Sequence, residues 1–420
     1  MTRKRGRRPN FWRILALLTL IGAAFYVDRV VVPATPPLFI PTATPTRNPE
    51  SFIAEADAFL EEGKLTQAIA AYEKAVRSDP YNVSIYLSLA RAQMYTNQYE
   101  PALENAKNAL VRNNANPLGH TLKAWALDYL KNYTEAEASI KQALELDPDS
   151  AFAHAVYAEI LMDKALVGQG DIGVIDQAAE ESRLAKSLDP SLMEARRARG
   201  YVLWKTGNFA EAIEEYKAAL AINDKIANLH LALGFNYHAL GEYDQAVQSY
   251  LQAYALNPTD PSALYQISRT YYTVGDFSQS VQYADQAVQA DPTDPSLHGN
   301  LGVMHYKNNQ LDLAVTELSL AIHGGTLQDG SLVEGIPLNY GTVAEFYAVY
   351  GLALAKSDHC SQAVPIFQAI RTNLPNDEIN SYNAEYGLLL CQEGVQAGVE
   401  AAETISVTSA EVTATPESLP

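Results

Sequence analysis

The sequence predicts an all-α protein, built as a solenoid of about nine helix hairpins with one further helix at its C-terminal end. Three observations predict this class. A small residue recurs in each second helix, mostly at intervals of 34 residues. A matching small residue marks each first helix, where the two helices of a hairpin would cross. A proline follows many of the second helices, where it would end them.

Residues 227–260 form the clearest hairpin in the sequence. They are expected to form a helix, a turn and a second, antiparallel helix, with Gly234 and Ala246 where the two helices cross. Gly241 suits the left-handed position of the turn, and Pro258 ends the second helix. Since a single hairpin cannot bury its apolar face alone, it needs copies of itself on both sides.

The copies follow one register along most of the chain. Most steps are 34 residues, with one of 42 and one of 49, so we expect extra residues inside the fourth copy and before the ninth. The second-helix marks are Ala68, Ala102, Ala136, Ala178, Ala212, Ala246, Ser280, Ala314 and Ala363. The first-helix marks are Ala56, Ala90, Ala124, Ala158, Gly200, Gly234, Ser268, Gly302 and Gly351.

A 34-residue period with small, aromatic and proline positions in a fixed order resembles the tetratricopeptide repeat (TPR) family. The resemblance covers roughly residues 49–392. It implies a right-handed superhelical stack whose first helices line a concave groove. In this family such grooves hold peptides or partner proteins.

The resemblance also implies which side chains face the groove, because it assigns concave positions on each first helix. These are aromatic rings and arginines, which suit a protein-binding surface. We expect about half of them to pack into the core instead. The predicted groove residues are Arg91, Tyr95, Trp125, Tyr129, Arg197, Tyr201, Trp204, Phe235, Tyr265, Arg269, Tyr272 and Tyr306.

The N-terminal segment is predicted to place the protein at the plasma membrane. Residues 1–10 form a basic cytoplasmic cap. Residues 11–32, which are apolar apart from Arg13, Asp28 and Arg29, are expected to act as a single-pass transmembrane signal anchor. The solenoid would then be extracytoplasmic. A signal peptide cleaved after Ala24 is the alternative. Residues 33–50, rich in proline and threonine, are expected to be an extended linker.

The C-terminal part departs from strict period. The solenoid is predicted over 51–399, with a glycine-rich long loop at 322–343 and a capping helix at 379–392. Residues 400–420 are predicted to be a disordered tail. Cys360 and Cys391 are the only cysteines, and TPR geometry would bring them close enough for a disulfide that fixes the cap, unless the cap drifts out of register.

The charge and the motifs argue against several classes of function. The net charge is −19, and the six basic groups of residues 1–13 leave −25 for the remainder, which disfavours nucleic acid. No catalytic, metal-binding or cofactor-binding motif occurs, so we expect neither an enzyme nor a metal or cofactor. Four histidines share one repeat position, which indicates packing. Acidic residues are expected on solvent faces.

These observations lead to one functional hypothesis and two alternatives. The hypothesis is a non-enzymatic, membrane-tethered scaffold that binds a protein or peptide partner in its concave groove. One alternative is a structural or self-assembling spacer of the cell envelope. The other is a non-catalytic glycan-binding module, because tyrosine and tryptophan rings also stack on sugars.

Overall fold

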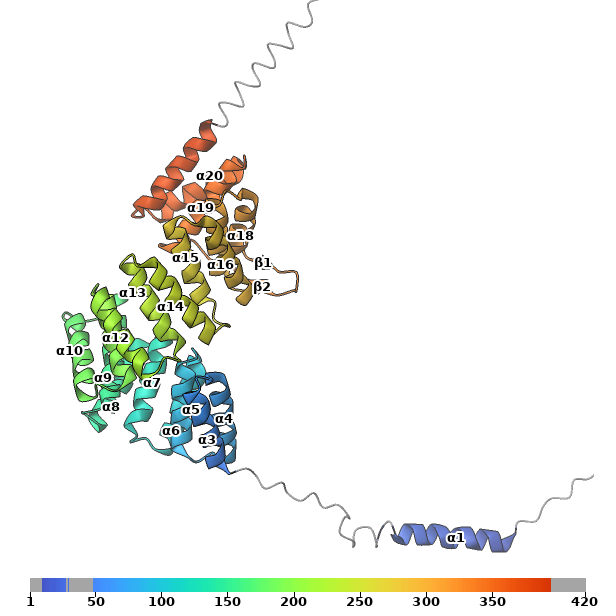
Figure 1. The fold of residues 1–420 in the computed structure, drawn as a ribbon. Helices are drawn as coiled ribbons and strands as arrows, with labels where there is room; N and C mark the ends of the chain where they lie inside the picture. The colour runs from blue at the N-terminus through green and yellow to red at the C-terminus, as the bar shows by residue number, and fades with distance from the viewer. Residues whose placement is uncertain (1–9, 28, 30–47, 394–420) are drawn as a thin grey trace, which may run out of the picture.

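The computed structural model describes residues 10–27, 29 and 48–393 (Figure 1). Within 48–393 it is a continuous stack of helix hairpins, followed by a last helix over residues 378–393. The hairpins are α3 (Pro49–Glu61) with α4 (Leu65–Ser78), α5 (Val83–Met94) with α6 (Tyr99–Arg112), α7 (Pro117–Tyr129) with α8 (Tyr133–Leu146), α9 (Ala151–Leu166) with α10 (Val174–Leu188), α11 (Met193–Lys205) with α12 (Phe209–Ile222), α13 (Ala227–Ala239) with α14 (Tyr243–Leu256), α15 (Ser262–Val274) with α16 (Phe277–Ala290), α17 (Pro295–Lys307) with α18 (Leu311–His323), and α19 (Thr342–Lys356) with α20 (Cys360–Asn373).

The predicted repeat register is confirmed by the packing. Every small register mark of both helices is buried in the structure. Gly234 shows why these positions are small, because a Cβ atom there would lie 2.4 Å from the ring of Tyr250 on the paired helix. The aromatic ring therefore fills the space that the missing side chain leaves, and the two helices cross closely.

The turn inside every hairpin has the same backbone conformation. The residue five positions before each second-helix mark has a positive φ, which favours glycine and tolerates asparagine. These residues are Gly63, Asn97, Lys131, Gly173, Gly207, Gly241, Gly275, Asn309 and Asp358. Lys131 has φ +60°, a conformation that is costly for a residue with a side chain.

The four histidines at the shared repeat position are structural. Each ring Nε2 lies within hydrogen-bond distance of the backbone carbonyl oxygen six residues earlier, and so ties its helix to the preceding loop. The distances are 2.9 Å for His120, His154 and His298 and 3.0 Å for His230. The bond explains why histidine recurs at this position.

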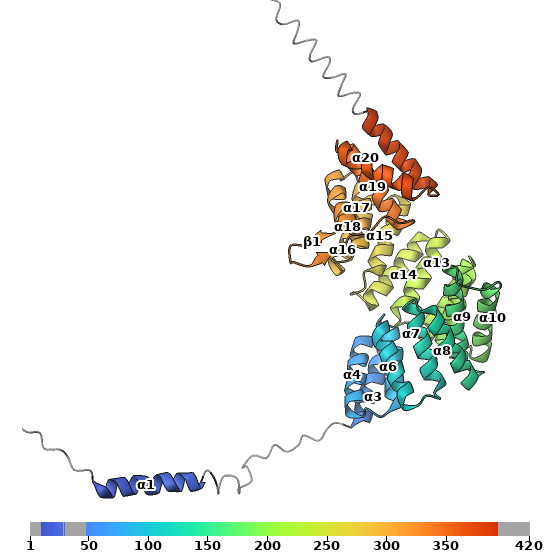
Figure 2. The ribbon, with the colours of Figure 1, turned by 180° about the vertical axis from the view of Figure 1, so that it is seen from behind.

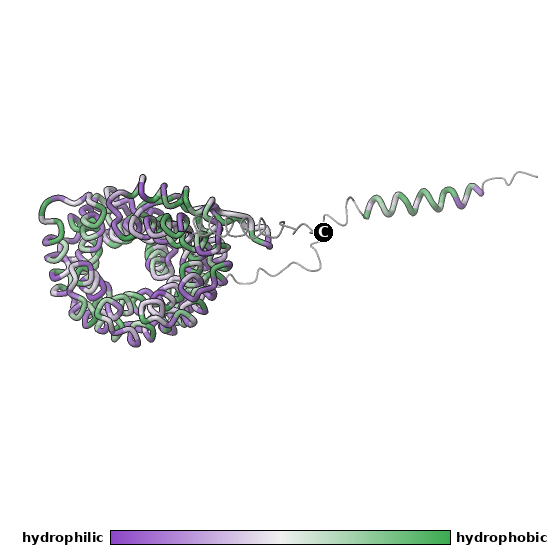
Figure 3. The backbone as a smooth tube through the Cα atoms, turned by 90° about the horizontal axis from the view of Figure 1, so that it is seen from above, coloured by the Kyte–Doolittle hydropathy of each residue, from purple (hydrophilic) through white to green (hydrophobic). Residues whose placement is uncertain are grey.

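The first turn of the superhelix closes on itself. Viewed along its axis, the stack winds into a ring (Figure 3). The Asn97 amide donates to Asp260 over 3.0 Å, and the Asn228 amide donates to the Asn97 side-chain oxygen over 2.9 Å. These bonds join the turn of the second repeat to α13 of the sixth repeat and to the loop that follows α14. Inner helices far apart in the sequence therefore face one another across a narrow space.

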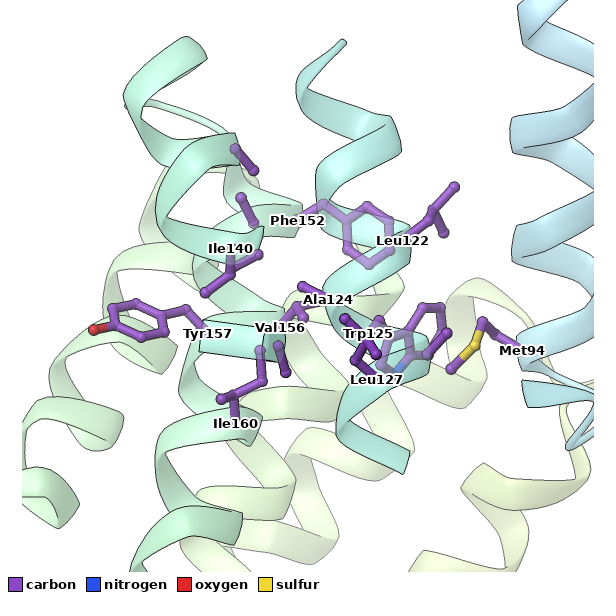
Figure 4. Packing of buried hydrophobic residues seen from close by; sticks show 14 of the residues in the cluster. Met94, Leu122, Ala124, Trp125, Leu127, Ile140, Phe152, Val156, Tyr157 and Ile160 are labelled. Carbon is purple, nitrogen blue, oxygen red and sulfur yellow. The ribbon is translucent and has the colours of Figure 1, made fainter. Parts of the chain in front are cut away.

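The core of this turn is built around Trp125, which is 1% exposed (Figure 4). Its ring meets those of Tyr95 and Phe152 edge to face, each at a centroid distance of 5.6 Å. Figure 4 shows Met94 beside Trp125 and Leu122 beside Phe152. Trp125 therefore belongs to the hydrophobic core, although the repeat position predicted a groove residue.

The insertion before the ninth repeat contains a small hairpin that the sequence did not predict. β1 (Gly325–Thr326) and β2 (Leu332–Val333) pair antiparallel, with Gly325 opposite Val333. This hairpin projects beside α18 (Figures 1 and 2). At the end of the stack, Cys360 and Cys391 are joined by a disulfide that ties α20 to the last helix.

The N-terminal apolar segment differs from its prediction. α1 (Phe11–Tyr26) has 16 residues, and none of them is buried. No helix among the described residues is long and apolar enough to cross a membrane. The structure therefore does not show the predicted span over 11–32, of which residues 28 and 30–32 lie outside the described residues. The predicted basic cap, most of the linker and the tail at 400–420 lie outside the described residues.

Candidate functional site

Among the hollows in the described part of the stack, two on the concave side differ in chemistry. The first, which we call the acidic cavity, lies in the closed turn and has a volume of about 330 Å³. The second, which we call the C-terminal groove, has a volume of about 760 Å³ and lies along α15, α17, α19 and the last helix. Both are lined by inner helices, because the superhelix turns the first helix of each repeat toward its axis.

The acidic cavity combines carboxyl groups with aromatic rings. Its acidic residues are Asp128 on α7, Glu159 and Asp163 on α9, and Asp260 in the loop before α15. Its aromatic walls include Tyr99, Tyr129, Tyr201, Trp204, Tyr216 and Phe235. The rings of Trp204 and Phe235 stack at 5.3 Å with an interplanar angle of 10°. Such walls exclude water and raise the free-energy cost of each unpaired charge.

One cation lies inside this cavity among the described lining residues. The Arg197 guanidinium donates to Glu159 over 2.8 Å and lies 4.3 Å from the centre of the Trp125 ring. Burial raises the pKa of Glu159 to about 7, although the nearby Arg197 lowers it. Asp163 accepts a hydrogen bond from the Tyr201 hydroxyl, and burial raises its pKa as well.

Asp128 has no such partner. Its side chain is 2% exposed, and no hydrogen-bond donor in the described part of the protein reaches either carboxylate oxygen. Burial raises the pKa of Asp128, and the negative charges of Asp163 and Glu159 raise it further. A buried carboxylate without a partner is rare and needs an explanation.

A second polar cluster supports the closure of the ring. The Arg91 Nε donates to Glu194 over 2.8 Å, and the Tyr95 hydroxyl donates to the same carboxylate oxygen. Glu194 is fully buried, whereas the Arg91 side chain is 40% exposed. The cluster joins α5 to α11, which are 103 residues apart at these positions. Arg91 and Tyr95 therefore hold the ring closed, although both also line a hollow of about 460 Å³.

The C-terminal groove is open and rich in tyrosine. Tyr272 and Tyr306 line one side, and Tyr382 and Tyr386 of the last helix line the other. Ile379, also in the lining, is 76% exposed, and Tyr382 is 71% exposed. The groove also contains Lys307, Glu345, Asp377, Asn380 and Asn383. It therefore offers apolar rings and polar groups together, as peptide-binding surfaces do.

The predicted groove residues divide between these places. Trp125 is buried, and Arg91 and Tyr95 close the ring. Five residues line the acidic cavity: Tyr129, Arg197, Tyr201, Trp204 and Phe235. Only Tyr272 and Tyr306 line the C-terminal groove, while Arg269 pairs with Glu345 at 3.0 Å and Tyr265 packs against the core beside it. The repeat position fixes the concave side correctly, but it does not say whether that side is open.

The expectation that acidic residues lie on solvent faces is wrong for several of them. Asp128, Glu159 and Glu194 are each less than 5% exposed. Glu194, Asn97 and Asp260, which help to close the ring, were not among the predicted functional residues. An acidic residue at a concave repeat position was the available signal for Asp128 and Glu159. Glu194 had no comparable signal, since its partners lie about a hundred residues away.

Comparison with known families supports the repeat assignment. Models of the TPR repeat match residues 56–95, 200–241 and 236–275, and models of the tetratricopeptide repeat match 119–150 and 265–326. The matched segments fall on the helix hairpins described above. The chain belongs to the tetratricopeptide repeat family.

Similar proteins include other TPR proteins of much greater length. Mouse tetratricopeptide repeat protein 28 is 27% identical over 177 residues, covering 40% of this chain and 6% of that protein. Human tetratricopeptide repeat protein 21B is 27% identical over 139 residues, covering 32% of this chain and 10% of that protein. This TPR chain thus spans a small part of the relatives it matches.

A solved structure shares the same fold. The crystal structure of the APC/C hetero-tetramer Cut9–Hcn1 aligns with a TM-score of 0.53 at 15% identity. The alignment covers 74% of this chain and 55% of the other. At this identity the likeness shows the TPR solenoid fold alone.

Within the described residues, no group of three or more potential ligand side chains is arranged to hold a metal ion.

Proposed function

We propose that this TPR protein is a non-enzymatic scaffold that holds an extended segment of a partner protein in the C-terminal groove. TPR repeats indicate a protein-interaction scaffold in general. The observation that supports this groove is its open face with four tyrosines, Tyr272, Tyr306, Tyr382 and Tyr386. Rigid aromatic rings bury a large area on binding at a low entropic cost.

The polar groups of the groove fit an extended peptide. The Asn383 amide offers both a donor and an acceptor to a peptide backbone. Lys307 is exposed, and its Nζ lies 5.5 Å from the centre of the Tyr272 ring, so a carboxylate of the partner would find a cation there. The N-terminal turn also has a hollow of about 460 Å³, but Arg91 and Tyr95 in its lining are already bonded to Glu194.

The test is capture of partners by chemical crosslinking in intact cells, followed by their identification. A Tyr272→Ala/Tyr306→Ala double variant should lose the captured partner, since central aromatic residues of an interface contribute about 2 kcal/mol or more each. Tyr81→Ala is the matched control, because Tyr81 is 82% exposed and lies far from the groove in the sequence. Retention of the partner by the double variant, with unchanged circular dichroism, would refute the proposal.

We also propose that the TPR domain is extracytoplasmic and tethered to the plasma membrane through residues 11–32. Two features support this location. A basic segment precedes the apolar stretch, as in membrane anchors, and the Cys360–Cys391 disulfide is of a kind that persists in oxidising compartments.

The location is tested with the full chain. After denaturation without reductant, neither cysteine should react with a maleimide, and both should react after reduction. Reaction of both thiols without reductant would contradict an oxidising location. Alkaline carbonate should leave the full chain in the membrane pellet and release a variant that lacks residues 1–32. Release of both proteins from the membrane pellet would contradict the proposed tether.

Self-assembly is a second candidate function, and one observation favours it. Ile379, Tyr382, Tyr386 and Leu389 form an exposed apolar stripe on the last helix, where a further repeat would stack. A second copy could cover this stripe. Sedimentation equilibrium at micromolar concentration would detect that association, and a monomer throughout the range would exclude it.

A further inference from the structure

The acidic cavity has a charge imbalance that no part of the scaffold function requires. Asp128, Glu159 and Asp163 face one guanidinium, that of Arg197. Lys205 is nearby on α11, but its Nζ lies 3.6 Å from the centre of the Trp204 ring, and its charge acts on Asp163. Additional positive charge in the cavity would therefore be electrostatically favourable.

Two hydrogen-bond donors of the cavity serve the other carboxyl groups, and the buried Nε of Arg197 has no partner of its own. Arg197 donates to Glu159 over 2.8 Å, and the Tyr201 hydroxyl donates to Asp163. Asp128 remains without a donor on either oxygen, although its side chain is 98% buried and lines the cavity. A buried carboxyl group oriented into a cavity without a protein partner is a site for a ligand that donates hydrogen bonds.

The walls restrict the class of ligand. The faces of aromatic rings carry negative potential, and Tyr129, Tyr201, Trp204 and Phe235 all line the cavity. Leu231 and Ala232 on α13 add apolar surface. An anion would be repelled by the carboxyl groups, and a neutral molecule would not offset the excess of carboxyl groups over cations in the lining. An organic cation with an aliphatic stem satisfies the carboxylate and the walls together.

We propose that the acidic cavity binds an alkylammonium group, with Asp128 as its principal ion partner and Asp163 as a second acceptor. The ammonium supplies three donors, and its stem lies against the aromatic walls. In the free protein, burial and the neighbouring carboxylates raise the pKa of Asp128. When the ammonium group binds, Asp128 releases its proton to the solvent. The group reaches the cavity either as a free small amine or as a lysine side chain of a bound segment.

The test is isothermal titration calorimetry of the full chain with two cationic probes. The free-amine probe is 1,5-diaminopentane, and its neutral control is 1,5-pentanediol. The side-chain probe is acetyl-Gly-Lys-Gly-amide, and its control has norleucine in place of lysine. Asp128→Asn removes the charge at nearly constant shape, and Asp285→Asn, at an exposed position on α16, is the matched control.

We expect saturable binding of at least one cationic probe and none of its neutral control. Asp128→Asn should weaken that binding at least about tenfold, because removing one partner of a buried charge pair mainly raises the dissociation rate. Asp285→Asn should leave it unchanged. Binding of the diamine alone assigns a free amine, and binding of the peptide alone assigns a side chain. No saturable binding by either probe, or equal binding by Asp128→Asn, would overturn the proposal.

Thermal unfolding of the same variants distinguishes a loss of ligand binding from a loss of folding. Asp128→Asn should unfold no earlier than the wild type without ligand, and it should gain less than the wild type when the binding probe is added. An equal gain in both proteins would also overturn the proposal.

Discussion

Replacement of Asp128 by asparagine should stabilise this protein, although Asp128 is among its most buried polar residues. Most substitutions at a 2% exposed position are destabilising. Here the wild-type carboxylate has no protein hydrogen-bond partner and faces Asp163 and Glu159. Asparagine keeps the shape, removes the repulsion and can donate to either neighbouring carboxylate.

The magnitude follows from the cost of the unpaired group. A buried polar group without a partner costs about 1–3 kcal/mol, and more when it is charged. We therefore expect Asp128→Asn to raise the free energy of unfolding by about 1–3 kcal/mol at neutral pH. The gain should depend on pH. Because the pKa of Asp128 is raised on folding, the folded wild type binds more protons than the unfolded chain, and it loses stability as pH rises above the unfolded value of about 4.

The assay is thermal unfolding followed by circular dichroism, at about pH 4 and about pH 8, where the carboxyl group of the unfolded chain is about half protonated and almost fully ionised, respectively. The midpoint of Asp128→Asn should exceed that of the wild type at the higher pH and approach it at the lower pH. Asp285→Asn should follow the wild type at both. A lower midpoint for Asp128→Asn at the higher pH would show that Asp128 has a stabilising partner, and the reasoning would fail.

Three further predictions concern other parts of the stack. Lys131→Gly should raise stability by about 1 kcal/mol in urea unfolding, because Lys131 has a positive φ that glycine adopts freely; unchanged or lower stability would contradict this. Cys391→Ser should destabilise the last helix by at most about 4 kcal/mol, because the disulfide closes a loop between residues 31 positions apart. Hydrogen exchange of the last helix should then be faster. Unchanged exchange there would show that the disulfide does not stabilise this helix. Arg91→Ala should lower the free energy of unfolding by about 2–3 kcal/mol, because the Tyr95 hydroxyl would then be the remaining donor to the buried Glu194 carboxylate. Small-angle scattering should show a more open ring. An unchanged scattering profile would refute the role of Arg91 in closure.

The repeat register was predictable because it depends on contacts that are local in the sequence. A small residue such as Gly234 and the ring of Tyr250 that packs on it are 16 residues apart, within one hairpin. The chain therefore repeats the same local requirement in every copy. The turn positions follow for the same reason, and Lys131 shows that other residues are accepted at some cost.

The closure of the ring was not predictable in this way. It depends on the sum of small rotations between successive repeats, and on contacts such as that of Asn97 with Asp260, which are 163 residues apart. Closure decides that Arg91, Tyr95 and Arg197 face other parts of the same chain, whereas Tyr272 and Tyr306 stay in an open groove. The family pattern gives the concave side of each repeat, and only the assembled superhelix shows what faces it.

The position of a partner in the C-terminal groove is the central claim, and site-specific photocrosslinking tests it most directly. A photoreactive phenylalanine analogue would replace Tyr306 in the groove in one variant and Tyr81 on the outer surface in another. Irradiation of cells should give a defined adduct from position 306 and none of the same mass from position 81. The same adduct from both positions, or no adduct from position 306, would contradict the account.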